Sequence, residues 1–289
     1  MTPSNREPAL YAPMPSLIYG TAWKKERTQG LVERALALGY RGIDTACQPK
    51  HYDEAGVGAA LRAAFARGLE RREVYVQTKF TPLRGQDPKR VPYDPKANLA
   101  EQVRQSVRAS LKNLQTEYLD AILLHSPLPR FEQTLKVWRE FEALRASGGL
   151  GGPSLLGLSN CYDLETLTAL HAASEVKPSI LQNRFYADTA YDTELRLWCG
   201  AHSVVYQSFW TLSANPHLLA HSTTLELAKL HGVSAAQVLF RGLIQLGVVP
   251  LTGTTNETHM QEGLASLHFS LSDTDLERLR QTFEPDLGR

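Results

Sequence analysis

Eight short apolar runs recur along the chain, and segments with helical spacing of apolar residues separate them. Four of these segments, residues 26–38, 53–68, 97–114 and 130–147, place apolar residues three or four positions apart, as amphipathic helices do. Strands that alternate with helices form parallel sheets with right-handed crossovers, either open or closed. Eight units without a break in composition predict a single-domain (β/α)8 barrel over residues 1–289, with residues 1–15 as an irregular N-terminal segment. The predicted strands are residues 16–20, 40–45, 73–79, 118–125, 154–159, 179–183, 203–208 and 247–252.

Two segments interrupt the alternation. Residues 80–95 are rich in proline, glycine and charge, and residues 209–222 combine aromatic residues with proline and polar residues. The composition of residues 80–95 predicts an irregular loop. Both segments follow predicted strands, so we expect them at the carboxyl face of the barrel, where active sites of this architecture lie. By contrast, the glycine-rich residues 148–153 join a helix to the next strand, which predicts a flexible connector at the opposite face. Residues 56–58, "GVG", fall within a helical pattern and indicate close packing.

The composition limits the classes of binding partner that we expect. Lysine plus arginine (31) nearly equals aspartate plus glutamate (30), so no net charge favours nucleic acid or an anionic membrane. The N-terminal residues lack an apolar signal-peptide core, and no run approaches the roughly 18 apolar residues of a membrane span. The three cysteines are too scattered for a disulfide framework or a zinc site. We therefore expect a cytoplasmic protein with a small-molecule partner and no metal.

Three consecutive strands of the predicted barrel end in a polar residue. They are Asp44, Lys79 and His125, and Tyr52 follows in the loop after Asp44. Strand ends on the carboxyl face point into the barrel mouth, so we expect an aspartate–lysine pair there. A free phenol has a pKa of about 10, and bringing it near neutrality requires about 4 kcal/mol of differential stabilisation. A neighbouring lysine could supply much of it, so this set predicts protonation of a carbonyl oxygen that His125 positions.

The segment "GYRGIDTACQPKHYDEAGVGAAL" resembles the signature of the aldo-keto reductase family. The resemblance continues through "VYVQTKF", "EYLDAILLHSP", "LLGLSN", "ILQNRFY", "YQSFW" and "VVPLTGTTNETHMQEGL", and so covers nearly the whole chain. It implies that Asp44, Tyr52, Lys79 and His125 are the catalytic residues, with Tyr52 as proton donor. It also implies hydride transfer from a nicotinamide cofactor that lies extended across the barrel mouth, with NADPH as the family's usual cofactor.

The resemblance further implies where ligands bind. Cofactor-binding positions are Gly20, Thr21, Ala22, Ser159, Asn160, Gln182, Gln207, Ser208, Leu212, Gly253, Thr254, Thr255, Asn256, His259 and Glu262. Candidate substrate-pocket aromatics are Trp23, Phe80, Phe185 and Trp210, with ordinary core packing as the alternative for each.

Four departures from the family pattern leave alternatives open. Asp44 and Tyr52 are eight residues apart rather than the usual five or so, so His51 competes for the proton-donor position. Gln207 stands where the family has a tyrosine that stacks on the nicotinamide, so another ring such as Tyr206, Phe209 or Trp210 could stack instead. The last cofactor loop lacks two of the cations that grip the 2′-phosphate of NADPH, which leaves NADH possible. Finally, the short loop after His125 and the short C-terminal segment imply a more open pocket or one completed by residues 80–95.

The sequence thus predicts NAD(P)H-dependent reduction of an aldehyde or ketone by a monomer or weak oligomer that binds neither nucleic acid nor membrane. One alternative is a regulatory or partner-binding protein that binds the cofactor with little turnover. Another is a barrel aldolase in which Lys79 forms a Schiff base.

Overall fold

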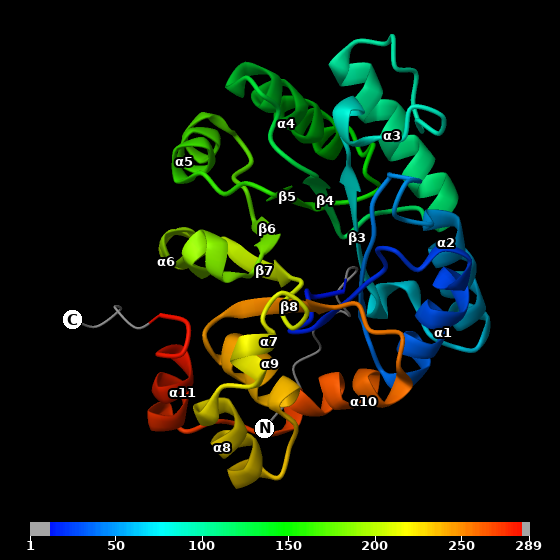
Figure 1. Ribbon diagram of the computed structural model, residues 1–289. Coiled ribbons are helices and arrows are strands. Elements are labelled where there is room, and N and C mark those ends of the chain that lie inside the picture. Colours follow the sequence, from blue (N-terminus) through cyan, green and yellow to red (C-terminus); the bar gives the residue numbers. More distant parts are fainter. Residues whose placement is uncertain (1–11, 285–289) are drawn as a thin grey trace, which may run out of the picture.

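The computed structural model describes residues 12–284, and within them eight parallel strands close into a barrel in sequential order (Figure 1). The predicted (β/α)8 fold is confirmed, and each strand falls within two or three residues of its expected position. Residues 12–15 contain no helix or strand; the remainder of the expected irregular segment, residues 1–11, lies outside the described residues. The strands are β1 Ile18–Gly20, β2 Gly42–Asp44, β3 Tyr75–Phe80, β4 Ala121–Leu124, β5 Leu155–Ser159, β6 Ile180–Arg184, β7 Val205–Phe209 and β8 Val248–Thr252.

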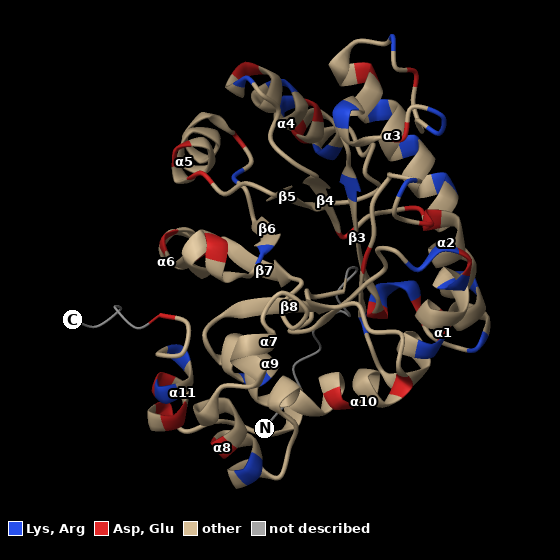
Figure 2. Cartoon of the chain, viewed as in Figure 1, with Lys and Arg blue, Asp and Glu red and all other residues tan. Residues whose placement is uncertain are grey.

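Helices surround the barrel (Figure 1), and basic and acidic residues are interspersed along them (Figure 2). The α-helices are α1 Thr28–Leu38, α2 Glu54–Ala66, α3 Leu99–Leu114, α4 Phe131–Ala146, α5 Leu164–Ala173, α6 Thr193–Ala201, α7 Pro216–Leu219, α8 Ser222–His231, α9 Ala235–Gln245, α10 Glu257–Ala265 and α11 Asp273–Arg280. The 3₁₀ segments are η1 Lys25–Arg27, η2 Arg71–Glu73, η3 Leu83–Gly85, η4 Ala187–Asp192 and η5 Ser266–His268. No helix within residues 12–284 combines the length and apolar character needed to cross a bilayer.

Side-chain caps fix where several helices begin. The carboxylate of Asp53 accepts from Gly56 N at 3.0 Å at the start of α2, and the amide oxygen of Asn98 accepts from Glu101 N at 3.0 Å at the start of α3. Such caps satisfy backbone donors that have no partner inside the helix. The "GVG" glycines act in packing: a Cβ on Gly58 would lie 2.1 Å from Asn113 O, so α2 and α3 can approach only with glycine there.

Alternation along the strands divides the side chains between two layers. Outward residues of the strands pack with the helices in two large clusters of buried apolar side chains, one of which contains Trp138 and Phe141 of α4. Inward residues fill the lower barrel with a smaller apolar cluster that includes Tyr75, Leu123 and Ile180. Above that cluster the inward residues are polar, which places chemistry at the carboxyl ends of the strands.

The two unusual loops lie at this carboxyl end, as expected. Residues 209–222, which interrupt the predicted alternation, contain α7 and the start of α8. Residues 80–95 contain the short η3 turn and hold the loop after β2: Gln48 Nε2 donates to Gly85 O at 2.7 Å, and Gln86 Nε2 donates to Cys47 O at 2.9 Å. Residues 148–153 join α4 to β5 at the opposite end of the barrel.

Candidate active site

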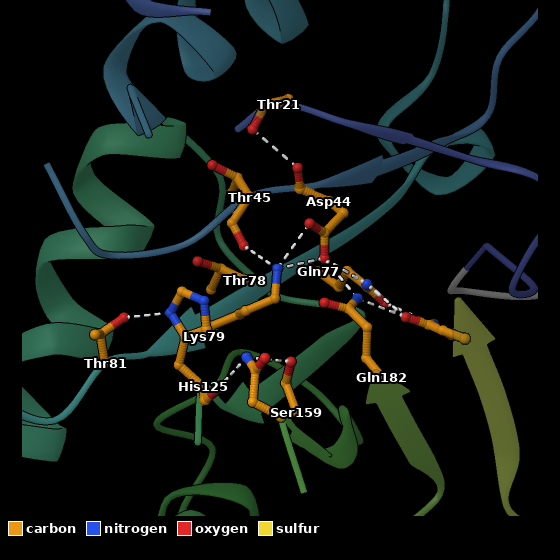
Figure 3. Close-up of polar contacts among 12 residues, drawn as sticks. Thr21, Asp44, Thr45, Gln77, Thr78, Lys79, Thr81, His125, Ser159 and Gln182 are labelled. Atoms are coloured by element: carbon orange, nitrogen blue, oxygen red, sulfur yellow. Dashed lines mark hydrogen bonds and ion pairs between the residues drawn. The ribbon is translucent and has the colours of Figure 1, made fainter. Parts of the chain in front are cut away.

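A buried ion pair lies at the bottom of the barrel mouth. Asp44 ends β2, and Lys79 lies on the neighbouring strand β3. Lys79 Nζ is 2.6 Å from Asp44 Oδ1 and 2.7 Å from Oδ2, and it donates to Thr45 O at 2.9 Å (Figure 3). Both side chains are almost completely buried. Three oxygen acceptors therefore hold the ammonium group in one place.

Three glutamines surround this pair in the same layer of the barrel. Gln77 Nε2 and Gln182 Nε2 donate to Asp44 Oδ1 at 2.6 and 3.0 Å, and both also donate to Gln207 Oε1 at 2.8 Å. The strand register explains the layer, because Asp44 pairs with Gln77 and Gln182 pairs with Gln207 across adjacent strands. We call Asp44, Gln77, Lys79, Gln182 and Gln207 the floor.

The loop after β2 brings Tyr52 over this floor. His51 N and Tyr52 N both donate to Gln48 O at 3.1 Å, so the additional residues form a turn. The Tyr52 ring centroid lies 5.3 Å from Lys79 Nζ and 5.9 Å from the His125 ring, which it meets edge-on. The His51 ring instead stacks on Trp23, with centroids 3.7 Å apart. Of the two neighbours, Tyr52 is thus the one that contacts the floor and His125.

Backbone and side-chain contacts fix the orientation of His125. Its Nδ1 lies 2.6 Å from Thr81 Oγ1, and its backbone oxygen accepts from Asn160 Nδ2 at 2.8 Å (Figure 3). Because Nδ1 is engaged with Thr81, Nε2 is the ring nitrogen left for a ligand. Burial, and then the nearby Lys79 ammonium, lowers the pKa of His125 to about 3, so the ring is neutral at pH 7.

The electrostatics of Tyr52 differ from the sequence expectation. Burial first, and the Asp44 carboxylate second, raise the pKa of Tyr52 above its usual value. Burial also lowers the pKa of Lys79, and Asp44 opposes that shift. The expected lowering of the phenol pKa is therefore absent, because burial and, second, the Asp44 carboxylate both favour the neutral phenol. Burial and Lys50 lower the pKa of His51, which leaves that ring neutral at pH 7.

A cavity of about 690 Å³ opens above the floor. It brings together many of the predicted site residues from distant parts of the chain. Those that line it are Asp44, His51, Tyr52, His125, Gly20, Ala22, Ser159, Asn160, Gln182, Leu212, Gly253, Thr254, Trp23 and Trp210. Gln182 directs both amide protons into the floor, and its Oε1 accepts no hydrogen bond from another described residue, which leaves an acceptor for a ligand amide.

Other predicted residues lie outside this lining. Gln207 is fully buried in the floor, and Phe209, two positions later on the same face of β7, lines the cavity. Thr21 Oγ1 donates to Asp44 O at 2.9 Å, and Ser208 Oγ contacts Thr211 Oγ1 at 2.9 Å. Thr255, Asn256, His259 and Glu262 lie around the start of α10, where Asn256 Oδ1 accepts from His259 N at 3.2 Å.

Phe80 and Phe185 take the alternative position that the sequence left open for them, the hydrophobic core. Each directly follows an inward-facing residue, Lys79 or Arg184, so strand alternation turns its ring toward the helices. That alternation was visible in the sequence and could have excluded both from the cavity.

Sequence reasoning also missed residues that the structure places at the site. Arg184 lines the cavity two positions after Gln182, and the same alternation would have indicated it. Lys24 is buried and donates from Nζ to Gly253 O at 2.7 Å, in the loop after β8. Burial, and then Arg27, lower the pKa of Lys24 to about 8. Within residues 12–284, no group of three or more histidine, cysteine, aspartate or glutamate side chains is arranged to hold a metal.

Comparisons with known proteins agree with this geometry. The family model described as "Aldo/keto reductase family" matches residues 16–284. An aldo-keto reductase of Mycobacterium sp. (strain JLS) is 30% identical over 252 residues, which are 87% of this chain and 82% of that protein. The methylglyoxal reductase DkgA of Salmonella typhimurium is 29% identical over 266 residues, 91% of this chain and 87% of that protein.

A solved structure of an aldo-keto reductase from a Medee basin deep-sea metagenome library superposes with a TM-score of 0.78. It is 25% identical and covers 93% of this chain and 91% of its own. With a barrel of the same topology and a family match over nearly all described residues, the chain belongs to the aldo/keto reductase family.

Proposed function

We propose that the chain reduces an aldehyde or ketone to an alcohol, with NADPH or NADH as hydride donor and Tyr52 as proton donor. The observation that carries this proposal is the position of the Tyr52 ring, which lies beside both Lys79 Nζ and the His125 ring at the bottom of the cavity. When bound at this cavity, a nicotinamide cofactor would supply the hydride for the carbonyl carbon. The carbonyl oxygen must then receive a proton, and the chain's own residues supply it.

His125 orients the carbonyl and Tyr52 protonates it. If the Thr81 hydroxyl donates to Nδ1, neutral His125 carries its proton on Nε2 and donates a hydrogen bond to the carbonyl oxygen. A phenol with its ordinary pKa of about 10 is already protonated at neutral pH. Burial and Asp44 raise the pKa of Tyr52 further, so the phenol carries the proton to be donated. After transfer the phenolate is negative, and the fixed ammonium of Lys79 stabilises it.

The polar residues of the cavity fit a nicotinamide cofactor. Ser159, Asn160 and the free Oε1 of Gln182 offer hydrogen bonds for its carboxamide, and Gly20 and Ala22 leave room beside the ring. Lys24 supplies a cation beside Gly253, near the loop from which two family cations are missing. We propose NADPH as the cofactor, with NADH accepted because this grip is reduced. Thr255, Asn256, His259 and Glu262 remain predicted contacts of its distal end.

The position of Lys79 disfavours the aldolase alternative. A Schiff-base lysine must present a free amine to the substrate. Lys79 Nζ is instead surrounded by Asp44 and Thr45 oxygens, and Lys79 is outside the cavity lining.

The test compares Tyr52→Phe with His51→Gln in reduction of a simple aromatic aldehyde, followed by loss of NADPH absorbance. Loss of a general acid typically costs 10²- to 10⁴-fold in rate, so we expect kcat of Tyr52→Phe to fall about 10³-fold. The His51→Gln variant should retain kcat within about tenfold, because His51 contacts Trp23 rather than the floor.

The reverse ranking of the two variants would assign the proton to His51. If the wild-type chain binds NADPH, measured by quenching of tryptophan fluorescence, but reduces no aldehyde, then the regulatory alternative replaces this proposal.

A further inference from the structure

We propose that Arg184, which contacts the rings of Trp210 and Tyr186, is an anion-binding subsite of the cavity that takes a carboxylate or phosphate group of a ligand. Arg184 is the last residue of β6, and it shares the inward face of that strand with Gln182. Both residues line the cavity that also contains Tyr52 and His125. A group bound to Arg184 is therefore part of a molecule that can also reach the proposed reaction centre.

The guanidinium of Arg184 is unpaired. Its Nε is buried without a hydrogen-bond acceptor among residues 12–284, and no carboxylate of those residues forms an ion pair with it. Other partly buried arginines within residues 12–284 donate to acceptors: Arg71 pairs with Asp120 at 2.8 Å, and Arg145 Nε donates to Ser154 O at 3.0 Å. A buried donor without an acceptor is unfavourable, and an arriving anion would satisfy it.

Aromatic rings fix the plane of this guanidinium. Its Cζ lies 4.1 Å from the Trp210 ring centroid and 4.9 Å from that of Tyr186. The hydroxyl of Tyr162 accepts from Arg184 N at 3.2 Å, which anchors the backbone at the same place. Rings over a guanidinium cover its faces and leave its edge, whose parallel N–H groups match the two oxygens of a carboxylate or phosphate.

The backbone of Trp210 supports a ligand-binding role. Its φ is +57°, a left-handed conformation that a bulky residue adopts at a cost and that recurs at ligand sites. This conformation places an indole that is 49% exposed at the cavity, in contact with Arg184. Asn160, at the end of β5, has a φ of +52° and lines the same cavity.

The charges of the cavity also favour an anion at Arg184. Among the lining residues within 12–284, Arg184 is the one lysine or arginine. The carboxylate of Asp44 is neutralised by Lys79, and His125 is uncharged at pH 7. The fixed charge not offset within the cavity is therefore that of Arg184.

The first experiment needs no turnover, so it stands even if the proposed reductase activity fails. Calorimetric titration compares benzoate, neutral benzamide and inorganic pyrophosphate on wild type, Arg184→Gln and Arg184→Lys, with exposed Arg62→Gln of α2 as the matched control. We expect benzoate or pyrophosphate to bind wild type more tightly than benzamide does, and Arg184→Gln to weaken that binding about 10- to 100-fold, as loss of a charged hydrogen-bond partner does. Arg184→Lys should recover part of the loss, and Arg62→Gln should change nothing.

The second experiment identifies the source of the anion, and this arm rests on the proposed function. If the anion belongs to the substrate, Arg184→Gln raises the KM for 4-carboxybenzaldehyde about tenfold or more, whereas the KM for 4-nitrobenzaldehyde changes by less than about threefold. If it belongs to the cofactor, Arg184→Gln raises the Kd of NADPH and affects both aldehydes equally. Unchanged binding of benzoate, pyrophosphate and NADPH in a folded Arg184→Gln protein would overturn the subsite.

Discussion

The floor and the rim of the cavity are built on opposite principles. We define the rim as Trp23, His51, Arg184 and Trp210. Floor residues lie on strands, are almost completely buried, and bond to one another through short hydrogen bonds. Rim residues lie at strand ends and in loops, where the Trp23 ring contacts the His51 ring and the Trp210 ring contacts the Arg184 guanidinium. Trp23 is 58% exposed and Trp210 is 49% exposed, and both have positive φ.

This difference separates two functions of one site. The floor residues share one hydrogen-bond network, so a substitution at one of them disturbs the others. Such a floor is suited to a reaction step that must be the same for every substrate. A rim of stacked side chains can be altered one residue at a time, so it is suited to selecting the ligand. We therefore expect floor substitutions to reduce stability and kcat together, and rim substitutions to change KM with little effect on stability.

The largest effect should come from Lys79→Met in the floor. It leaves the Asp44 carboxylate buried without its cation, a change that typically costs about 3–5 kcal/mol. We expect a fall of that size in the free energy of unfolding, measured by urea denaturation, together with loss of aldehyde reduction.

A double variant tests the cause of this loss. Lys79→Met combined with Asp44→Leu removes both charges, so it should recover part of the stability while remaining inactive. If Lys79→Met alone loses less than about 1 kcal/mol, the floor is not the rigid unit described above.

A smaller effect is expected for Trp23→Ala in the rim. The substitution removes a ring that stacks on His51 but is mostly exposed, so the free energy of unfolding should fall by about 1 kcal/mol or less. KM for an aromatic aldehyde should rise severalfold with kcat nearly unchanged, in steady-state assays. Trp23→Phe keeps a ring at this position and serves as the control; a fall in kcat comparable to that of Lys79→Met would remove the distinction between rim and floor.

The same contrast explains how much the sequence could predict. Asp44 and Lys79 were predicted to lie at the site because the carboxyl ends of barrel strands point into the barrel mouth, and Gln182 was predicted from the family resemblance. Arg184 was missed because the predicted sixth strand ended at residue 183, one position short of β6. The positions of the rim tryptophans could not be derived from such periodicity. Trp23 and Trp210 both adopt a left-handed φ, which no sequence pattern indicates for a bulky residue.

The loop after β2 is a second region whose conformation could not be predicted from the sequence. Its turn at Gln48 determines that Tyr52, rather than His51, lies near Lys79. That turn depends on contacts with residues 80–95, which are distant in sequence. Residue spacing alone therefore left both side chains as candidates.

The smallest effect concerns a buried acid that lacks a cation, Glu54. Its carboxylate accepts from Thr78 Oγ1 at 2.6 Å, Ser110 Oγ at 2.8 Å and Asn113 Nδ2 at 3.4 Å, and no lysine or arginine of residues 12–284 forms an ion pair with it. Burial raises the pKa of Glu54 above its ordinary value of 4.5, and these hydrogen bonds oppose the shift. Below that ordinary value both the folded and unfolded chains hold the proton, so the raised pKa has no effect on stability there.

As the pH rises above 4.5, the unfolded chain releases the Glu54 proton first, so this group makes folding progressively less favourable until the folded pKa is passed. Glu54→Gln removes that dependence and keeps an oxygen acceptor for Thr78 and Ser110. The stability of Glu54→Gln relative to wild type should therefore be higher at pH 8 than at pH 4, in urea unfolding at both values. At pH 8, Asp44→Asn should instead destabilise the protein, because Lys79 is left without its anion. If Asp44→Asn costs no more stability at pH 8 than Glu54→Gln does, the cation partner does not distinguish the floor from other buried acids.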